Sequence, residues 1–234
     1  MDQTYYRVFD LSRVVEQIDG AKHPKFVKAV KAFHAACSVE LDLRTVRLCV
    51  DELIKIDKAE LSPGMANLGQ FLLTHAVVTY VRATHSKAIS RFNVGVIGAY
   101  DRRLRAFHKD IVTLRDKCLA HFGPGDDLWN DERVLYLETP RENAVTMAHR
   151  RINFRRDTIN GLDELILAAL PHVKQLQKDR ADDLNAELET LPAELSEAIN
   201  AEPFVPAEFY GANSPAEKSF WEEHGFYESY SKEG

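Results

Sequence analysis

The sequence has few of the residues that build metal sites or staple small secreted domains together. Its 234 residues contain three cysteines, and Cys37, Cys49 and Cys118 show no C-x-x-C spacing. An odd, widely spaced set of this kind predicts neither a disulfide framework nor a thiolate zinc site. We therefore expect the cysteines to be small buried thiols, and we expect no metal site and no cofactor. An apolar content of 45% is enough for one generous core, so the fold needs neither disulfides nor a metal to hold it together.

Long apolar runs are also lacking. No window approaches the roughly 20 apolar residues that cross a bilayer, and residues 1–5 lack the basic stretch and apolar run of a secretory signal. These absences predict a cytoplasmic protein without a membrane segment. The motifs G-x-x-x-x-G-K-[ST], G-x-G-x-x-G and G-x-S-x-G are missing too, so P-loop hydrolysis, dinucleotide binding and serine-hydrolase chemistry lose their usual support.

The net charge of −6 conceals two segments of opposite sign. Residues 181–234 hold 13 acidic residues against two lysines, Lys218 and Lys232. Residues 82–117 hold nine basic residues against three acidic ones. A basic segment of this kind can face a polyanion such as RNA, whereas the acidic tail cannot.

Apolar residues recur every three or four positions through most of the chain, which is typical of amphipathic helices. The sequence therefore predicts a mainly α fold, an antiparallel helical bundle. The surest helix ends at Gly123-Pro124-Gly125, and Pro171 is expected to kink or interrupt a later one. The expected helical segments are Phe26–Phe33, Val46–Ile54, Leu68–Val81 (conceivable also as a strand), Ala99–Phe122, Asp157–Leu176 and Ala181–Ile199.

Two short β-prone runs interrupt the helical pattern. Arg133–Glu138 and Ala144–Met147 are separated by a turn-forming segment with Pro140, which predicts a small β-hairpin inserted after the surest helix. The expected organisation is a bundle over residues 1–180, with the hairpin near 133–154, followed by a C-terminal helix and an acidic tail over 181–234. Because this tail is rich in aromatic residues, we expect it to pack on its own core or on a twin subunit.

The residues with the clearest chemical content lie at the end of the surest helix. At about 100° per residue, Arg115 falls inside the apolar arc of this helix. Its stem can lie along the core while the guanidinium reaches water, or the helix can face a cleft or a second copy of itself. His121 follows about 9 Å further along the axis and roughly 120° around it. A two-fold dimer can therefore bring two arginines and two histidines into one cleft.

Arginine and histidine suit the cleavage of RNA without a metal. Histidine titrates near neutral pH, so it can take a proton from the 2′-hydroxyl or give one to the leaving oxygen. Arginine keeps its charge and can hold a phosphate through two N–H groups.

The segment Leu114–His121 resembles the signature of HEPN domains, which has an arginine, a polar residue and, a few residues later, a histidine. The resemblance implies a helical bundle that acts as a homodimeric, metal-independent endoribonuclease, a hydrolase of toxin–antitoxin or phage-defence systems, with an antitoxin as a further partner. It implies that Arg115 and His121 are catalytic and that Asp116 supports them. The residues expected to bind RNA are the basic ones nearby, namely Lys117, His108, Arg102, Arg103, Arg105, Arg150 and Arg151.

A non-catalytic helical interaction module, binding protein or nucleic acid, is the alternative. In that case Arg115 orders the edge of a core or a dimer seam. His121 is then favoured only by the helix dipole at a C-terminus. The free volume around His121 separates the two hypotheses, because an enzyme needs an open basic cleft.

Overall fold

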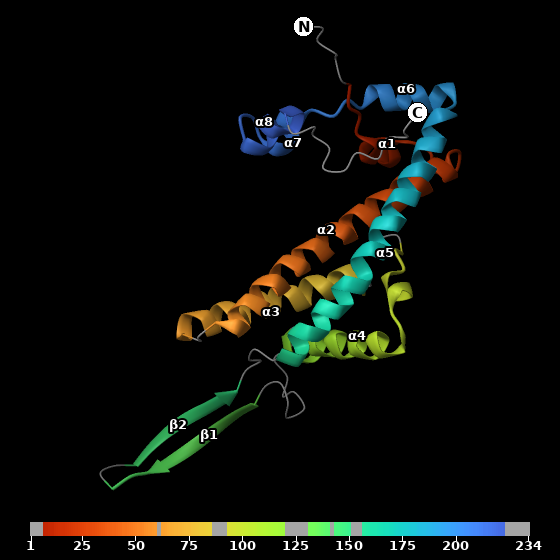
Figure 1. The fold of residues 1–234 in the computed structure, drawn as a ribbon. Helices are drawn as coiled ribbons and strands as arrows, with labels where there is room; N and C mark the ends of the chain where they lie inside the picture. Colours follow the sequence, from red (N-terminus) through yellow and green to blue (C-terminus); the bar gives the residue numbers. More distant parts are fainter. Residues whose placement is uncertain are drawn as a thin grey trace. The chain divides into compact units, whose positions relative to one another are not determined.

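The computed structural model describes residues 7–59, 62–85, 93–119, 131–140, 143–150 and 156–222. This described part is mainly α-helical and contains one two-stranded antiparallel sheet, which confirms the expected fold class at this level (Figure 1). The elements are, in chain order, α1 (Leu11–Gln17), α2 (Pro24–Lys58), α3 (Pro63–Thr84), η2 (Val96–Ala99), α4 (Arg102–Leu114), η3 (Arg115–Leu119), β1 (Asp131–Glu138), β2 (Asn143–Arg150), α5 (Arg156–Glu189), α6 (Ala193–Ala201), α7 (Pro206–Tyr210) and α8 (Pro215–Glu222).

The chain divides into two compact units. One unit comprises the described residues among 1–36 and 176–234, and the other comprises those among 37–175. The amino-terminal helix thus belongs with the C-terminal segment, whereas the sequence placed it with the bundle. The long helices α2 and α5 both run through the boundary.

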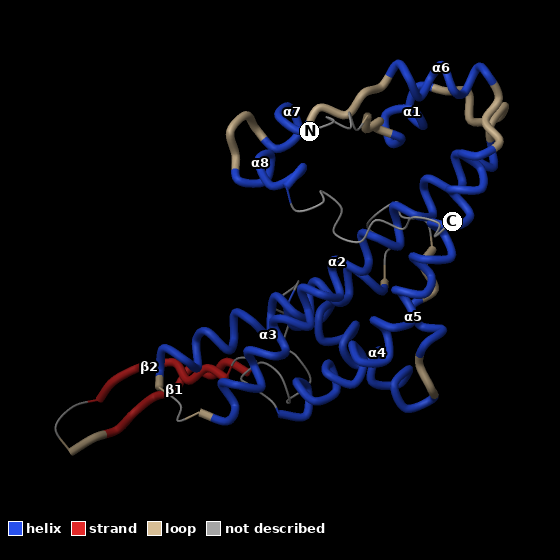
Figure 2. Tube along the Cα trace, turned by 45° about the horizontal axis from the view of Figure 1, so that its top comes forward, coloured by secondary structure: helices blue, strands red, loops and turns tan. Residues whose placement is uncertain are grey.

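The unit of residues 37–175 contains a bundle of helices from α2, α3, α4 and α5 (Figure 2). Two of its helices, α3 and α4, begin at good caps: the Ser62 hydroxyl accepts a hydrogen bond from Met65 N, and Asp101 accepts one from Leu104 N. Each helix turns one apolar face inward, which is the pattern that the helical period predicts. The innermost side chains are Leu43 and Leu53 from α2, Leu73 and Tyr80 from α3, Ile111 and Leu114 from α4, and Ile159, Leu162, Leu165 and Ile166 from α5.

The unit of residues 1–36 and 176–234 has a smaller core of its own. Val14, Phe26 and Val30 pack with Leu184, Leu195 and Ile199. Beside this core, Phe9 and Pro203 pair through their backbones in an isolated antiparallel bridge. Part of the aromatic tail also packs on itself, since ring pairs join Phe204 to Phe209 and Phe220, and Tyr210 to Phe209 and Phe220.

The predicted hairpin is confirmed, with strands slightly longer than the sequence indicated. β1 and β2 pair antiparallel, from Asp131 opposite Arg150 to Glu138 opposite Asn143. Alternate residues of a strand lie on opposite faces, so each face carries four cross-strand pairs. All the side chains described in this hairpin are exposed.

Three helix boundaries differ from the sequence prediction. The two helices expected near Phe26 and Val46 are one 35-residue helix, α2. Helix α5 continues through Pro171, which lacks the N–H that would bond to the Leu167 carbonyl. Leu167 is exposed, so water can satisfy that carbonyl. The helix expected over 181–199 is divided, because Pro192 begins a new helix, α6, as its cap.

Cys37 and Cys49 are thiols outside any disulfide. Cys49 is buried and Cys37 is partly buried, in keeping with the expected packing role. Burial raises the pKa of the Cys49 thiol above its usual value, because the thiolate would be poorly solvated. The side chain of Cys118 lies outside the described residues.

Candidate functional site

Helix α4 positions the start of the HEPN-like segment. Leu104, His108, Ile111 and Leu114 are buried at spacings of four, three and three residues, which fixes the inward face of the helix. The opposite face carries Arg102, Arg105 and Lys109, which are exposed. The helix therefore presents a basic outer face directly before the candidate catalytic residues.

The regular helix ends where the motif begins. Arg115 N donates hydrogen bonds to the carbonyls of both Ile111 and Val112, and residues Arg115–Leu119 form a π-helical turn, η3. This turn lies against α3 as well as α4. Such turns are rare and are found frequently at functional sites, because the wider spiral displaces side chains from their α-helical positions.

The side chain of Arg115 reaches solvent from a half-buried stem. Its guanidinium Nη1 donates a hydrogen bond of 2.8 Å to Oδ1 of Asp116, and the two side chains are 38% and 48% exposed. This geometry is compatible with a stem along the core and a head in water, and the packing of this face on a second copy stays a prediction. The carboxylate of Asp116 occupies part of the surface with which Arg115 would hold a phosphate.

The second proposed catalytic residue, His121, lies outside the described residues, as does Ala120. Among the residues expected to bind RNA, Arg102, Arg105 and Lys117 are exposed. Arg103 is also exposed, but its guanidinium forms an ion pair with Glu164 of α5. Arg150 ends β2, and neither its side chain nor Arg151 is among the described parts of the chain.

His108 lies inside the bundle, so we leave it out of the proposed RNA-binding surface. It is 5% exposed, and its Nδ1 lies 2.9 Å from the hydroxyl of Tyr80. The Tyr80 hydroxyl lies 3.1 Å from that of Tyr100. Burial, with a smaller contribution from His85, lowers the pKa of His108 below its usual value, so the ring is neutral at pH 7. Burial also raises the pKa of Tyr100 to about 12.

The ion pair between the exposed Arg82 and the buried Asp42 was not foreseen from the sequence. Arg82 Nη2 lies 2.6 Å from Asp42 Oδ1, and Nε lies 3.2 Å from Oδ2, which is the two-pronged geometry that arginine and carboxylate favour. The hydrogen bonds to Asp42 raise the pKa of Arg82. This arginine belongs to the basic segment 82–117, but its charge is used to join α3 to α2.

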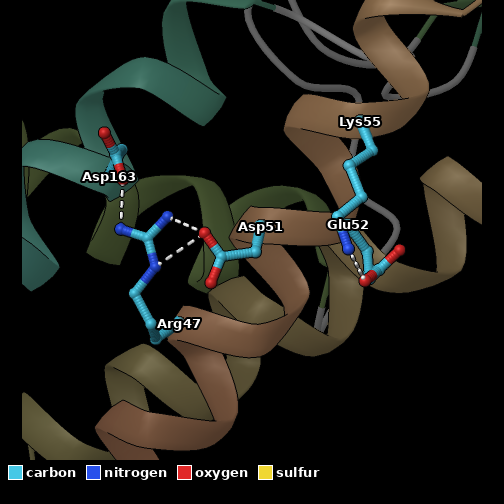
Figure 3. Close-up of polar contacts among 5 residues, drawn as sticks. All are labelled: Arg47, Asp51, Glu52, Lys55 and Asp163. Atoms are coloured by element: carbon cyan, nitrogen blue, oxygen red, sulfur yellow. Dashed lines mark hydrogen bonds and ion pairs between the residues drawn. The ribbon is translucent and has the colours of Figure 1, made fainter.

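A second polar cluster joins α2 to α5 (Figure 3). The Arg47 guanidinium points between two carboxylates, bonding to Asp51 of its own helix and to Asp163 of α5. Its hydrogen bond to Asp51 is the largest cause of the raised pKa of Arg47. Lys55 and Glu52 form a separate exposed pair one turn further along. Since both sides of the Arg47 guanidinium meet carboxylates, the cluster is suited to holding helices together and not to binding an anion.

The exposed Arg105 borders a cavity of about 350 Å³. Of the described residues that line this cavity, Arg105 carries the only charge, and Thr84 and Asn93 add polar groups. The remaining walls come from Val39, Ala83 and the backbone of residues 94–98. The basic face of α4 thus continues into a hollow of a size that admits a small ligand or one nucleotide unit.

Comparison of the chain with models of known protein families, with curated proteins and with solved structures gives no match. Among the described residues, no three His, Cys, Asp or Glu side chains gather where they could hold a metal ion. None of the described helices combines the length and the apolar character needed to cross a bilayer.

Proposed function

We propose that the protein is a metal-independent endoribonuclease of the HEPN type, acting as a homodimer in a toxin or phage-defence system. The observation that carries this proposal is the placement of Arg115, half-exposed at a π-helical turn directly after the basic face of α4. The resemblance of Leu114–His121 to the HEPN signature supports the same reading, as does the exposure of Arg102 and Arg105.

In the proposed reaction the chain supplies a proton acceptor and a fixed cation. The imidazole of His121 takes the proton of a ribose 2′-hydroxyl, whose oxygen attacks the adjacent phosphorus. The bond from phosphorus to the 5′-oxygen breaks, and that oxygen receives a proton from an imidazolium. Arg115 stabilises the added negative charge on the phosphate as five oxygens surround the phosphorus. Two copies of the chain provide the acid and the base in one cleft.

The role of Asp116 is to hold Arg115 in place between turnovers. Its carboxylate accepts a hydrogen bond from Arg115 Nη1. A phosphate that binds must share or displace this contact, since Arg115 Nη1 already donates to a carboxylate. Asp116 therefore holds the side chain of Arg115 in one position, and it lowers the affinity of the protein for RNA because it competes with the phosphate.

The experiment that tests the proposal is the incubation of purified protein with mixed RNA in EDTA. Wild type should cleave, whereas Arg115→Ala and His121→Ala should each slow cleavage at least a hundredfold. Arg13→Ala and His23→Ala are matched controls, because both residues lie in the other compact unit. Equal cleavage by all variants would remove Arg115 and His121 from the mechanism.

The alternative, a non-catalytic helical module that binds protein or nucleic acid, is favoured by the engagement of Arg115 with Asp116 and of Arg103 with Glu164. An arginine in an ion pair with a carboxylate can stabilise a helix and need take no part in catalysis. Under this alternative the wild type retains RNA or a partner protein with no turnover, and Arg115→Ala changes stability more than binding.

A further inference from the structure

The cavity of about 350 Å³ beside α4 is built within one of the two compact units. Val39 of α2 and Ala83 and Thr84 at the end of α3 line it, together with residues 93–98 and Arg105 of α4. Pockets that hold small molecules have volumes of about 300–1,000 Å³, so this cavity lies near the lower end of that range. It therefore suits a compact ligand.

The charge of the cavity comes from Arg105. The side chain of Arg105 forms no hydrogen bond or ion pair with another residue of the described part of the chain. By contrast, most arginines described in the same unit are held by a carboxylate, namely Arg44, Arg47, Arg82, Arg103, Arg115 and Arg156. No acidic residue is among the described residues that line the cavity. The guanidinium of Arg105 is thus available to an anion.

The polar side chains of Thr84 and Asn93 hold the walls of the cavity in place. Thr84 Oγ1 donates a hydrogen bond of 2.8 Å to the Tyr80 carbonyl, and Asn93 Oδ1 accepts one of 2.9 Å from Gly95 N. Gly95 has a φ of 69°, a left-handed conformation that glycine adopts without strain. Because the hydroxyl proton of Thr84 is already used, binding of an anion depends on Arg105.

Apolar residues and glycines make up the rest of the described lining. Val39, Ala83, Val94 and Val96 are buried, and Ile97 is 38% exposed. Buried side chains are held by the packing around them, so these walls exist before a ligand arrives. A ligand that reaches them from Arg105 gains affinity only if the part next to its anionic group is apolar.

We propose that this cavity binds a monocarboxylate with a compact apolar body, such as a short acyl chain. The carboxylate lies on the guanidinium of Arg105, which can bind both carboxylate oxygens at once, and the body lies against the apolar lining. One guanidinium balances the charge of one carboxylate. A phosphate monoester carries about −1.5 to −2 at pH 7, and the described lining supplies no second cation for it.

The length of the apolar body should decide the affinity. An ion pair between exposed groups in water contributes little, about a fivefold gain in affinity at most. Each CH₂ group that leaves water adds up to about a fourfold gain. Hexanoate should therefore bind about tenfold or more tightly than acetate. An exposed arginine without a cavity would bind the two carboxylates alike.

A titration of the whole protein followed by ¹H–¹⁵N correlation spectra tests the site. Sodium hexanoate should shift the amide signals of residues 93–98 and reach saturation, whereas acetate should bind more weakly by the factor given above. Hexanol, which lacks the charge, should bind about fivefold more weakly than hexanoate. The proposal is overturned if acetate or hexanol binds as tightly as hexanoate, if inorganic phosphate binds more tightly, or if hexanoate shifts only signals elsewhere.

Substitutions on α4 test the role of Arg105. Arg105→Ala should weaken hexanoate binding about fivefold, and Arg105→Lys should weaken it less, because lysine keeps the charge but not the two-pronged contact. Lys109→Ala is the matched control: it removes a charge one turn further along the same helix, and Lys109 is not among the described lining residues. Hexanoate binding by Arg105→Ala equal to that of wild type, or an equal loss in Lys109→Ala, would refute the assignment.

This inference goes beyond the proposed ribonuclease, and its experiments contain no RNA. If the protein binds hexanoate in the cavity but does not cleave RNA, the carboxylate site stands and the nuclease is lost. If the protein cleaves RNA but does not bind hexanoate, the nuclease stands and the carboxylate site is lost.

Discussion

The ring of Phe107 on α4 lies directly against the backbone of Gly161 on α5, in the space that a side chain at position 161 would fill. A methyl group there would overlap the ring atoms Cζ, Cε1 and Cε2. The absence of a side chain at Gly161 therefore lets α4 and α5 approach closely, and it fixes the helix that carries the candidate site.

Gly161→Ala should destabilise the protein by about 1–3 kcal/mol, because Phe107 must leave its position or the helices must separate. Gly64→Ala is the matched control in α3, where a Cβ atom would have its nearest neighbour, Ser62 Oγ, at 3.9 Å. This control should be neutral or slightly stabilising. Urea unfolding measures both, and a Gly161→Ala protein as stable as wild type would show that the ring moves aside freely.

Arg47→Ala should destabilise the bundle by about 1–2 kcal/mol, because it leaves Asp51 and Asp163 facing each other without a cation. The magnitude lies between those of exposed and buried pairs, since the Arg47 side chain is 22% exposed. A double-mutant cycle with Asp163→Asn, followed by urea unfolding, measures the coupling. Lys55→Met should change stability little, as its pair with Glu52 is exposed. Additive effects of Arg47→Ala and Asp163→Asn would contradict this account.

Stability should fall as the pH drops below about 6.5, the ordinary pKa of histidine. The folded-state pKa of His108 is lowered, so below pH 6.5 the unfolded chain binds a proton that the folded chain resists. The contribution is complete above that pH and is lost as the pH falls toward the folded pKa. Tyr80 and Tyr100 contact the ring, and His85 is the nearby charge that adds to the effect.

Denaturant unfolding at pH 7.5 and pH 5.5 checks this dependence. His108→Leu should show a smaller loss of stability between the two values than wild type shows. The other histidines are present in both proteins, so the difference between the two losses reports His108 together with its coupling to His85. An equal loss in both proteins would mean that His108 is protonated without cost.

Asp116→Asn should increase the affinity for RNA severalfold, because the Arg115 guanidinium would no longer share its charge with a carboxylate. Binding is measured at low salt with the catalytically silent His121→Ala background, and cleavage is measured in the parent protein. The gain in binding should shrink as salt rises. If Asp116→Asn loses cleavage as fully as Arg115→Ala, the carboxylate takes part in the reaction and does more than order the arginine.

The local features of the fold were accessible from the sequence, because they depend on residue spacing and turn chemistry. The three- and four-residue steps from Leu104 to Leu114 predicted α4, and the Pro140 turn between two β-prone runs predicted the hairpin. The sequence analysis did not predict that α2 and α5 are each one continuous helix. It placed helix ends near position 40 and at Pro171 because residue spacing and proline are local signals. Packing along the whole length of a helix decides whether it continues.

The polar contacts between helices could not be predicted in the same way. Arg47 and Asp163 are 116 residues apart in the sequence, and Tyr80 and His108 are 28 apart. Nothing local marks such pairs, apart from a charged or polar residue on an otherwise apolar face. His108 showed that signal, but it did not identify its partner. Arg115 was singled out by the same signal, and the structure shows its partner to be its immediate neighbour.

The π-helical turn at Arg115–Leu119 makes the candidate site sensitive to the number of residues and not only to their kind. Such a turn corresponds to an α-helix that holds one residue more than its hydrogen bonding needs. Removing a single residue, such as Lys117, would let regular α-helical winding resume, so the side chains within the turn would leave the positions that the wider spiral gives them. A deletion that takes away no catalytic group would thus remove the π-helical surroundings of Arg115, and re-inserting an alanine at the same point would restore them.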